Sequence, residues 1–191
     1  MQYKLTTPCT AEDLAPLKAG DTVLLSGVVY TARDQAHKRM LEALDKGEKL
    51  PFDLEGSAIY YVGPTPERPG EIIGSAGPTT SGRMDAMSPR LLDLGNKIMI
   101  GKGKRDAAVK EAVVRNGAVY LAALGGAGAL MARSVKTLEV IAWPDLGCEA
   151  VRRLTVEEMP LTVILDAHGG DLYLSGPAAY KRQQGEGAKE L

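Results

Sequence analysis

Aromatic residues, cysteines and long apolar runs are all scarce in this chain of 191 residues. It contains one Phe and one Trp, so its core must be built mainly from Leu, Val, Ile, Ala and Met. No apolar run approaches the roughly 20 residues that span a bilayer, and the first residues lack the pattern of a secretory signal. We therefore expect a cytoplasmic protein that has one large globular domain and does not insert into membranes.

Net charge and cysteine content narrow the possible partners. The formal net charge is −1, which argues against nucleic acid or a membrane surface bound through charge. Cys9 and Cys148 lie far apart without the spacing of metal ligands, so we expect free thiols and no metal bound by this chain. Iron–sulfur clusters usually take three or four thiolates, so any cluster chemistry would need another chain.

Strand-like and helix-like segments alternate along residues 1–175, which predicts one α/β or mixed α+β domain. Apolar and β-branched runs predict strands at residues 22–30, 57–62, 72–76, 97–101, 118–122, 137–142, 151–156, 161–166 and 171–174. Helical periodicity and capping residues predict helices at residues 11–17, 31–46, 88–94, 105–116 and 129–134. We expect the polar residues 176–191 to form a mobile tail.

Turn and capping residues define several ends of these elements. Thr10 is placed to cap the helix at 11–17, and Pro89 suits the first turn of the helix at 88–94. Thr31 and Asp34 have the spacing of a capping box, with Asp in place of the usual Glu. The pair Gly169-Gly170 predicts a hairpin turn between the last two strands.

Three loops each follow a predicted strand, and ligands gather at such strand ends in open α/β sheets. The first loop places Arg33 in the first turn of a helix, where the helix dipole disfavours a cation. An anionic ligand would resolve that conflict, and the alternative is an ion pair with Asp34 or a neighbouring carboxylate. His37, expected on the polar side of the same helix, would lie one turn from Arg33 and could support it.

The second loop, residues 77–84, reads Gly-Pro-Thr-Thr-Ser-Gly-Arg-Met. Its hydroxyl groups, its free backbone N–H groups and the planar guanidinium of Arg83 together suit a bound anion. The alternative is a structural turn in which Thr79 or Thr80 caps a helix.

The third loop, Gly101-Lys102-Gly103-Lys104, could let the backbone approach a ligand while Lys102 supplies a point charge. It matches neither a P-loop nor a dinucleotide-binding fingerprint, and the alternative is a solvated basic turn. Arg33, Arg83 and Lys102 would bring three cations together with few acids aimed at the same places. This pattern fits a small dianion such as a dicarboxylate.

Two other segments have structural interpretations. His168 lies within residues 166–171, most simply a hairpin turn, and neither histidine belongs to a metalloprotease or triad-like pattern. Residues 125–128, Gly-Gly-Ala-Gly, either cradle a ligand or allow a strand and a helix to pack closely. Neither segment adds a candidate residue to the three loops.

Taken together, the loops resemble the C-terminal domain of the class I, iron–sulfur-dependent fumarate hydratases and of the related tartrate dehydratases. In two-subunit forms of these enzymes this domain is a separate β subunit. The resemblance covers essentially residues 1–175. The matching stretches are Gly27–Lys38, Gly77–Asp85, Ile100–Gly103, Asp145–Ala150 and Asp166–Tyr173.

The resemblance implies a swivelling β/β/α three-layer domain and the reversible hydration of fumarate to L-malate, a reaction of the tricarboxylic acid cycle. It implies a hetero-oligomer in which the α subunit of fumarate hydratase holds a [4Fe-4S] cluster, so that this chain binds no cofactor and is inactive alone. The β subunit of tartrate dehydratase and a non-catalytic dicarboxylate-binding scaffold are the alternatives.

The resemblance also assigns roles to single residues. It implies that Thr80 removes the C3 proton of malate. The substrate carboxylates would be held by four residues, namely Arg33, Thr79, Arg83 and Lys102. Asp34 and His37 would hold these residues in position without contacting the substrate.

Overall fold

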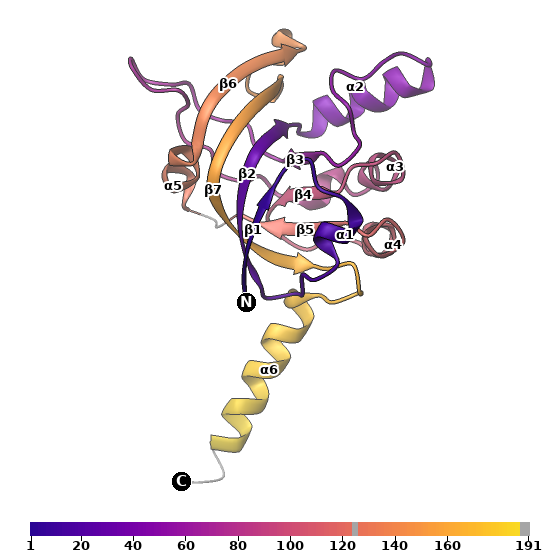
Figure 1. Ribbon diagram of the computed structural model, residues 1–191, viewed down its shortest axis with the longest axis vertical. Helices are drawn as coiled ribbons and strands as arrows, with labels where there is room; N and C mark the ends of the chain where they lie inside the picture. Colours follow the sequence, from indigo (N-terminus) through magenta and orange to yellow (C-terminus); the bar gives the residue numbers. More distant parts are fainter. Residues whose placement is uncertain (124–125, 188–191) are drawn as a thin grey trace.

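The structure is a computed structural model that describes residues 1–123 and 126–187, with side chains described as far as Lys181 (Figure 1). It is a mixed α/β fold, as expected. Its strands are β1 (Gln2–Thr6), β2 (Thr22–Thr31), β3 (Ala58–Tyr60), β4 (Ile98–Gly101), β5 (Val119–Ala122), β6 (Val135–Ala142) and β7 (Val151–Leu165). Its α-helices are α1 (Ala11–Leu14), α2 (Asp34–Asp45), α3 (Ser88–Asp93), α4 (Ala107–Arg115), α5 (Gly128–Arg133) and α6 (Leu172–Gly187). Two short 3₁₀ helices are η1 (Ser81–Met84) and η2 (Pro144–Glu149).

One long strand closes the sheet on itself. The seven strands follow the order β1-β2-β3-β4-β5-β7-β6, and β7 also pairs with β2. The pairs from β1 to β5 are parallel, whereas β7 runs antiparallel to β2, β5 and β6. Strands β2, β3, β4, β5 and β7 therefore form a ring, to which β1 and β6 are attached.

The alternation of side chains along the strands supplies two apolar clusters. Ile98 and Ile100 of β4 join a cluster on the face that the ring encloses, together with residues of β2, β5 and β7. Met99, between them, joins a second cluster that contains residues of α2, α3 and α4. Figure 1 shows these three helices along one side of the sheet, while α6 projects away from it. Among the described residues no helix is both long and apolar enough to cross a membrane.

Most predicted elements are confirmed, and the prediction for Thr10 holds in detail. Thr10 caps α1 and forms a reciprocal capping box with Asp13. The predicted strands at 22–30, 97–101, 118–122 and 137–142 correspond to β2, β4, β5 and β6. Pro89 lies in the first turn of α3, as expected. Local apolar pattern and capping chemistry were sufficient for these elements.

The capping box predicted at Thr31 is wrong. Thr31 is the last residue of β2, where its hydroxyl donates to the carbonyl of Ala150 at 3.3 Å and accepts from the N–H of Arg152 at 3.0 Å. The Thr31 hydroxyl therefore bonds to backbone groups of residues 150 and 152, at the start of β7, and not to the N-terminus of α2. Helix α2 begins at Asp34, with Arg33 in the N-cap position.

Two predicted strands are absent. Residues 72–76 form no strand, because Ser75 N–H donates to Thr65 and Ala76 N–H donates to the carbonyl of Gly128. The strand predicted at 171–174 is also wrong. The side chain of Asp171 accepts from the N–H of Tyr173 at 2.9 Å, and α6 starts at Leu172.

The strands predicted at 151–156 and 161–166 are a single strand, β7. Met159 and Pro160 pair with Leu25 and Leu24 of β2, so the proline does not interrupt the ladder. A bulge lies nearby, and Glu158 adopts a φ of 45°. The strand bends there instead of ending.

The C-terminal turn and tail differ in part from expectation. Gly169 and Gly170 lie in a turn closed by a bridge between Leu165 and Asp171, but no strand follows it. Helix α6 occupies residues expected to belong to the tail, and the mobility of residues 176–191 stays a prediction. In the glycine-rich turn, residue 125 lies outside the described residues, and Gly128 begins α5.

Candidate functional site

The three candidate loops meet at the carboxyl ends of adjacent parallel strands. Arg33 and Asp34 follow β2, and Lys102 follows β4. Thr79 is anchored beside the end of β3, because its N–H donates to the carbonyl of Tyr61 at 2.8 Å. The first and third loops follow strands as predicted, whereas the strand expected before the second loop is absent and that loop is instead held beside the end of β3. The sheet order β2-β3-β4 makes the three loops neighbours.

Thr80 and Lys102 occupy paired positions on two of these loops. They form an isolated parallel bridge, and both residues are exposed. Buried Ser81 fixes the pairing, because its N–H donates to the carbonyl of Lys102 at 2.9 Å and its hydroxyl accepts from the N–H of Lys102 at 3.0 Å. The hydroxyl of Tyr120 also donates to Ser81 at 2.9 Å. A threonine hydroxyl and an ammonium group are thus presented together to solvent.

Close packing explains the glycine at position 101. A Cβ built on Gly101 would come within 2.0 Å of the Ser81 hydroxyl oxygen. Any larger residue would therefore push Ser81, and with it the Thr80 and Lys102 backbone, out of place.

Arg83 connects the second loop to the start of α2. Its Nη2 donates to the hydroxyl oxygen of Thr79 at 2.5 Å and lies 3.2 Å from Oδ2 of Asp34. The Arg83 side chain is about half exposed, at 47%. A cation beside the Thr79 hydroxyl favours the deprotonated form of that group.

Arg33 is the most enclosed of the candidate cations. Its side chain is 20% exposed, and its Nη2 lies 3.5 Å from Oε1 of Glu149, beyond hydrogen-bond distance for a well-formed pair. The Nε atom is buried without a partner. No N–H group of the Arg33 guanidinium donates a hydrogen bond to any residue that the structure describes. Its donors are therefore available to an acceptor from outside these residues.

His37 supports Arg33 from inside the fold, and its predicted position on the polar side of the helix is wrong. The residue is fully buried, where α2 packs on the second apolar cluster. Its N–H and its Nδ1 lie 2.8 and 3.0 Å from the carbonyl oxygen of Arg33, and its ring meets the edge of Tyr61. Burial, with a smaller contribution from the charge of Arg105, lowers the pKa of His37 to about 4. The neutral ring therefore donates from Nδ1 to the Arg33 carbonyl.

A buried ion pair holds the second loop to the third. Arg105 donates from Nε to Asp85 at 2.6 Å and from Nη2 to Ser88 at 2.9 Å. The other oxygen of Asp85 accepts from the N–H of Asp106 at 2.7 Å. The Arg105 guanidinium also lies over the rings of Tyr61 and Tyr120. The pair fixes the register of the loops while lying beneath the exposed cluster.

The expected shortage of acids around the cations is wrong for both arginines. Arg33 pairs with a neighbouring carboxylate, Glu149, and Asp34 pairs with Arg83 instead. Only Lys102 matches the expectation, since its ammonium has no partner among the described residues. Both ion pairs are partly exposed and leave guanidinium N–H groups available, so they do not exclude an anion.

Four residues at this site were not singled out from the sequence, namely Ser81, Asp85, Arg105 and Glu149. Three lie in stretches that carried the resemblance, Ser81 and Asp85 in Gly77–Asp85 and Glu149 in Asp145–Ala150. Glu149 accepts a hydrogen bond from the N–H of Gln35, which is 114 residues away in sequence. No local spacing could have connected them.

Thr80, Arg83 and Lys102 are exposed, and none of the candidate residues lines either of two hollows on the described part of the molecule. Those hollows, of about 450 and 590 Å³, flank the loop that contains Thr65 and Ile73. The Arg83–Asp34 contact and the Thr80–Lys102 bridge join the three candidate loops, whereas the hollows are lined by a mixture of apolar, polar and charged side chains from other segments. A small ligand on such an open surface would need a cover from elsewhere.

The described residues do not fit an iron–sulfur cluster or a metal ion. Cys9 is buried, Cys148 is exposed, and both are free thiols, as expected. Burial raises the pKa of the Cys9 thiol to about 11, which disfavours the thiolate that a metal needs. Within residues 1–123 and 126–187, no group of three His, Cys, Asp or Glu side chains could hold a metal ion.

The comparisons of this chain with known proteins agree with one another. Residues 1–176 match the model of a family described as Fumarase C-terminus. A protein of Methanocaldococcus jannaschii, provisionally named L(+)-tartrate dehydratase subunit beta, is 42% identical over 86% of this chain and 87% of its own length. The L(+)-tartrate dehydratase subunit beta of Escherichia coli is 34% identical over 90% of this chain and 87% of its own length.

Longer relatives match over only part of their length. Fumarate hydratase 2 of Leishmania major is 39% identical over 85% of this chain, but the match covers 29% of that protein. The chain thus spans less than a third of this fumarate hydratase and most of each subunit named beta. With residues 1–176 matched, the chain belongs to the Fumarase C-terminus family.

Proposed function

We propose that this chain is the β subunit of a two-subunit hydro-lyase that interconverts L-malate and fumarate plus water. Family membership and the names of its relatives support a hydro-lyase component. Relatives that the chain matches over most of their length are named as subunits beta, which supports a second polypeptide that completes the site. We further propose that the closed sheet and its helices act as a swivelling β/β/α three-layer domain.

One observation carries the proposal: Arg33 is four-fifths covered yet makes no hydrogen bond from its guanidinium within the described residues. Among the described residues, the other arginines that are not exposed all donate hydrogen bonds, namely Arg39, Arg105 and Arg152. A covered guanidinium with unused donors fits a carboxylate, which it can bind in fork geometry. Arg83 and Lys102 lie on the adjoining loops and can serve the second carboxylate of a dianion.

In this proposal the chain binds and orients the substrate and removes a proton. Arg33, Arg83 and Lys102, with the Thr79 hydroxyl, hold the two carboxylates of malate. Thr80 takes a proton from C3, the C2–O bond breaks, and the leaving hydroxyl takes a proton from an acid of the α subunit, which gives fumarate and water. A threonine hydroxyl is a weak base, so it must act as an alkoxide or through a relay, and the nearby cations lower that cost. Thr79, which contacts Arg83 directly, is the alternative base.

We propose that the α subunit holds the [4Fe-4S] cluster, since the residues described here offer no ligand set for it. An iron with an open coordination position supplies Lewis acidity for the departure of hydroxide when the cluster is bound. The proposed roles of this chain are therefore limited to binding, orientation and proton transfer.

Tartrate is the second candidate substrate, because the relatives that this chain matches over most of their length are named as tartrate dehydratase subunits. Tartrate differs from malate by one additional hydroxyl group, and both are four-carbon dicarboxylates. The same arginines and lysine could bind either molecule. The neighbours of the second hydroxyl would come in part from the other subunit.

The test is to purify this chain, combine it anaerobically with a candidate α subunit that has three well-spaced cysteines, and reconstitute the cluster. We expect malate and fumarate to be interconverted by the complex and not by this chain alone. A higher kcat/KM for tartrate would identify a tartrate dehydratase. Turnover by the isolated chain would contradict the shared site. Calorimetry that finds tight dicarboxylate binding to the isolated chain, with no turnover by the complex, would instead identify a binding scaffold.

A further inference from the structure

The carboxylate of Glu149 contacts two different groups at the start of α2. Its Oε2 accepts from the N–H of Gln35 at 2.8 Å, and its Oε1 lies 3.5 Å from Nη2 of Arg33. The side chain is 18% exposed. Glu149 thus occupies the place of a missing helix cap and at the same time faces the most enclosed cation of the candidate site.

Helix α2 needs such a group because its own N-cap residue is unsuitable. Arg33 makes no side-chain capping bond, and its positive charge lies at the positive end of the helix dipole. An acidic side chain at this end satisfies an orphan N–H and opposes both positive charges. Without Glu149, the Arg33 guanidinium would be repelled from the helix end and would have no polar contact in the described residues to hold it.

The contact with Arg33 is an ion pair without a hydrogen bond. At 3.5 Å it restrains the guanidinium through charge, and the N–H groups keep their capacity to donate to a ligand. We propose that Glu149 is a positioning residue, which holds Arg33 in place for a substrate carboxylate and does not itself touch the substrate. This inference rests on the proposed function.

The segment that carries Glu149 is itself well fixed. Arg152 donates to the carbonyl oxygens of Gly147, Cys148 and Ala150 at 2.9, 3.1 and 3.0 Å. Gly147 has a φ of 59° and a ψ of −118°, which a residue with a side chain rarely adopts. The turn is therefore held independently of Arg33, so Glu149 can impose a position on the arginine.

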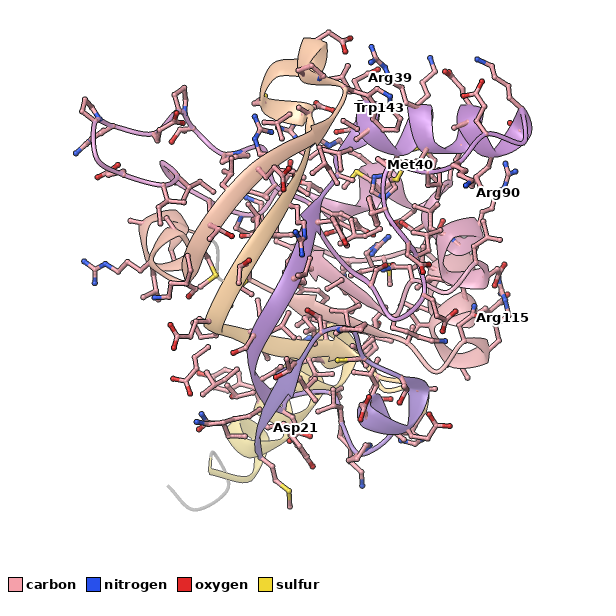
Figure 2. All side chains as sticks on the ribbon, turned by 45° about the horizontal axis from the view of Figure 1, so that its top comes forward. Asp21, Arg39, Met40, Arg90, Arg115 and Trp143 are labelled. Carbon is pink, nitrogen blue, oxygen red and sulfur yellow. The ribbon has the colours of Figure 1, made fainter. Side chains whose placement is uncertain are left out.

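The same segment provides a matched control. Asp145 of η2 forms an ion pair with Arg39 of α2, with Nη1 of Arg39 3.0 Å from Oδ1. Figure 2 shows Arg39 beside Trp143 at the outer end of the molecule, and its guanidinium lies 5.9 Å from the centre of that ring. Asp145→Asn removes one negative charge and one ion pair between the same two elements. It leaves Arg33 and its surroundings unchanged.

The test uses the reconstituted complex and the variants Glu149→Ala, Glu149→Gln and Asp145→Asn. We expect Glu149→Ala to lower Tm by about 2–4 °C through loss of the cap and to raise KM about threefold to tenfold. Glu149→Gln keeps an oxygen for the Gln35 N–H, so it should restore Tm but leave KM raised. If the role of Glu149 were merely structural, Glu149→Gln would restore both Tm and KM. Asp145→Asn should change KM only through the long-range effect of the lost charge.

A variant that has lost a negative charge could also attract the dianionic substrate more strongly, which would lower KM. Asp145→Asn measures the long-range part of this effect. If Glu149→Gln lowers KM relative to Asp145→Asn, then Glu149 competes with the substrate for Arg33 and the inference is overturned. Equal KM values in the two variants would overturn it as well.

A second readout does not depend on activity. The buried Nε–H of Arg33 should give an observable NMR resonance, identified by its loss in Arg33→Lys. We expect Glu149→Gln to shift this signal and speed its exchange with water, and Asp145→Asn to leave it unchanged. An active complex with an Nε–H signal that ignores Glu149→Gln would refute the inference alone. An inactive complex that binds no dicarboxylate, with the expected signal change, would refute the proposed function alone.

Discussion

The guanidinium of Arg33 lies directly against Gly63, so closely that a Cβ built on Gly63 would come within 2.5 Å of Nη1. The same Cβ would lie 3.2 Å from the carbonyl oxygen of Cys148. Gly63 follows β3, so the segment after this strand forms one wall of the space that Arg33 occupies. The absence of a side chain at residue 63 is therefore a requirement of the candidate site.

Gly63→Ala should displace the Arg33 guanidinium with little loss of stability. The clash falls on the far end of a flexible side chain, and the φ of Gly63 lies outside the left-handed region that favours glycine. We expect KM of the reconstituted complex for malate to rise roughly tenfold, because a small displacement of a binding group has large effects. Gly176→Ala in α6, where the new Cβ meets only ordinary contacts, is the control. An unchanged KM in Gly63→Ala would show that this position of Arg33 is irrelevant to binding.

Much of the fold could be predicted because its signals are local. Thr10 with Asp13 and Pro89 in α3 mark helix starts through contacts within a few residues. The errors arise where a distant segment decides the outcome. Thr31 could have capped a helix, but Ala150 and Arg152 of the β7 region take its hydroxyl instead. Separate strands were predicted at 151–156 and 161–166, but pairing with β2 continues through Met159 and Pro160, so that β7 is one strand.

The candidate site shows the same difference between local signals, which could be read from the sequence, and long-range contacts, which could not. Arg33, Thr79, Thr80, Arg83 and Lys102 were predicted as one group because each loop was expected to follow a strand. The strand expected before the second loop is absent, but Thr80 pairs with Lys102, Arg83 contacts Thr79, and Arg83 also contacts Asp34 beside Arg33. The partner of each arginine could not be predicted, since Glu149 reaches Arg33 only through the folded sheet. The burial of His37 was also missed. Sequence periodicity treats histidine as polar, whereas a bond to the Arg33 carbonyl satisfies its Nδ1 inside the protein.

Replacement of the two threonines separately should identify the base. Thr80→Val removes the hydroxyl and keeps the shape, so we expect kcat of the complex to fall at least a hundredfold while KM changes little. Thr79→Val removes the acceptor for Arg83 and should mainly raise KM. Steady-state kinetics for malate dehydration separate these effects. If Thr79→Val instead loses kcat at constant KM, the roles of the two residues are reversed.

The Asp85–Arg105 pair should dominate the stability of the loops. Asp85→Ala leaves Arg105, whose side chain is fully buried, without its counterion, so we expect a loss of about 3–5 kcal/mol in the free energy of unfolding. Asp93→Ala removes the exposed pair with Arg115 and should cost at most about 1 kcal/mol. Chemical denaturation of the two variants checks the comparison. Similar losses in both would mean that the buried pair has no special role.

The buried imidazole of His37 should make stability depend on pH in the acid range. Its pKa in the folded protein is about 4, below the ordinary value of 6.5, because burial disfavours the charged ring. Between these values the unfolded chain binds a proton that the folded protein does not, so stability falls as pH falls from 6.5 toward 4. It is fully present above pH 6.5, and the loss attributable to His37 reaches roughly 3 kcal/mol near pH 4.

His37→Asn tests this dependence, because the Asn amide can donate to the Arg33 carbonyl as Nδ1 does but does not titrate. Unfolding free energies from urea titrations at pH 7.0, 6.0, 5.0 and 4.5 would be compared between this variant and the unsubstituted protein. We expect the difference in free energy to change with pH by up to about 1.4 kcal/mol per unit below pH 6. His168→Asn, at the only other histidine, is the control. A pH-independent difference for His37→Asn would mean that the ring is accessible to protons in the folded state, and that the Arg33 carbonyl is not held by a permanently neutral donor.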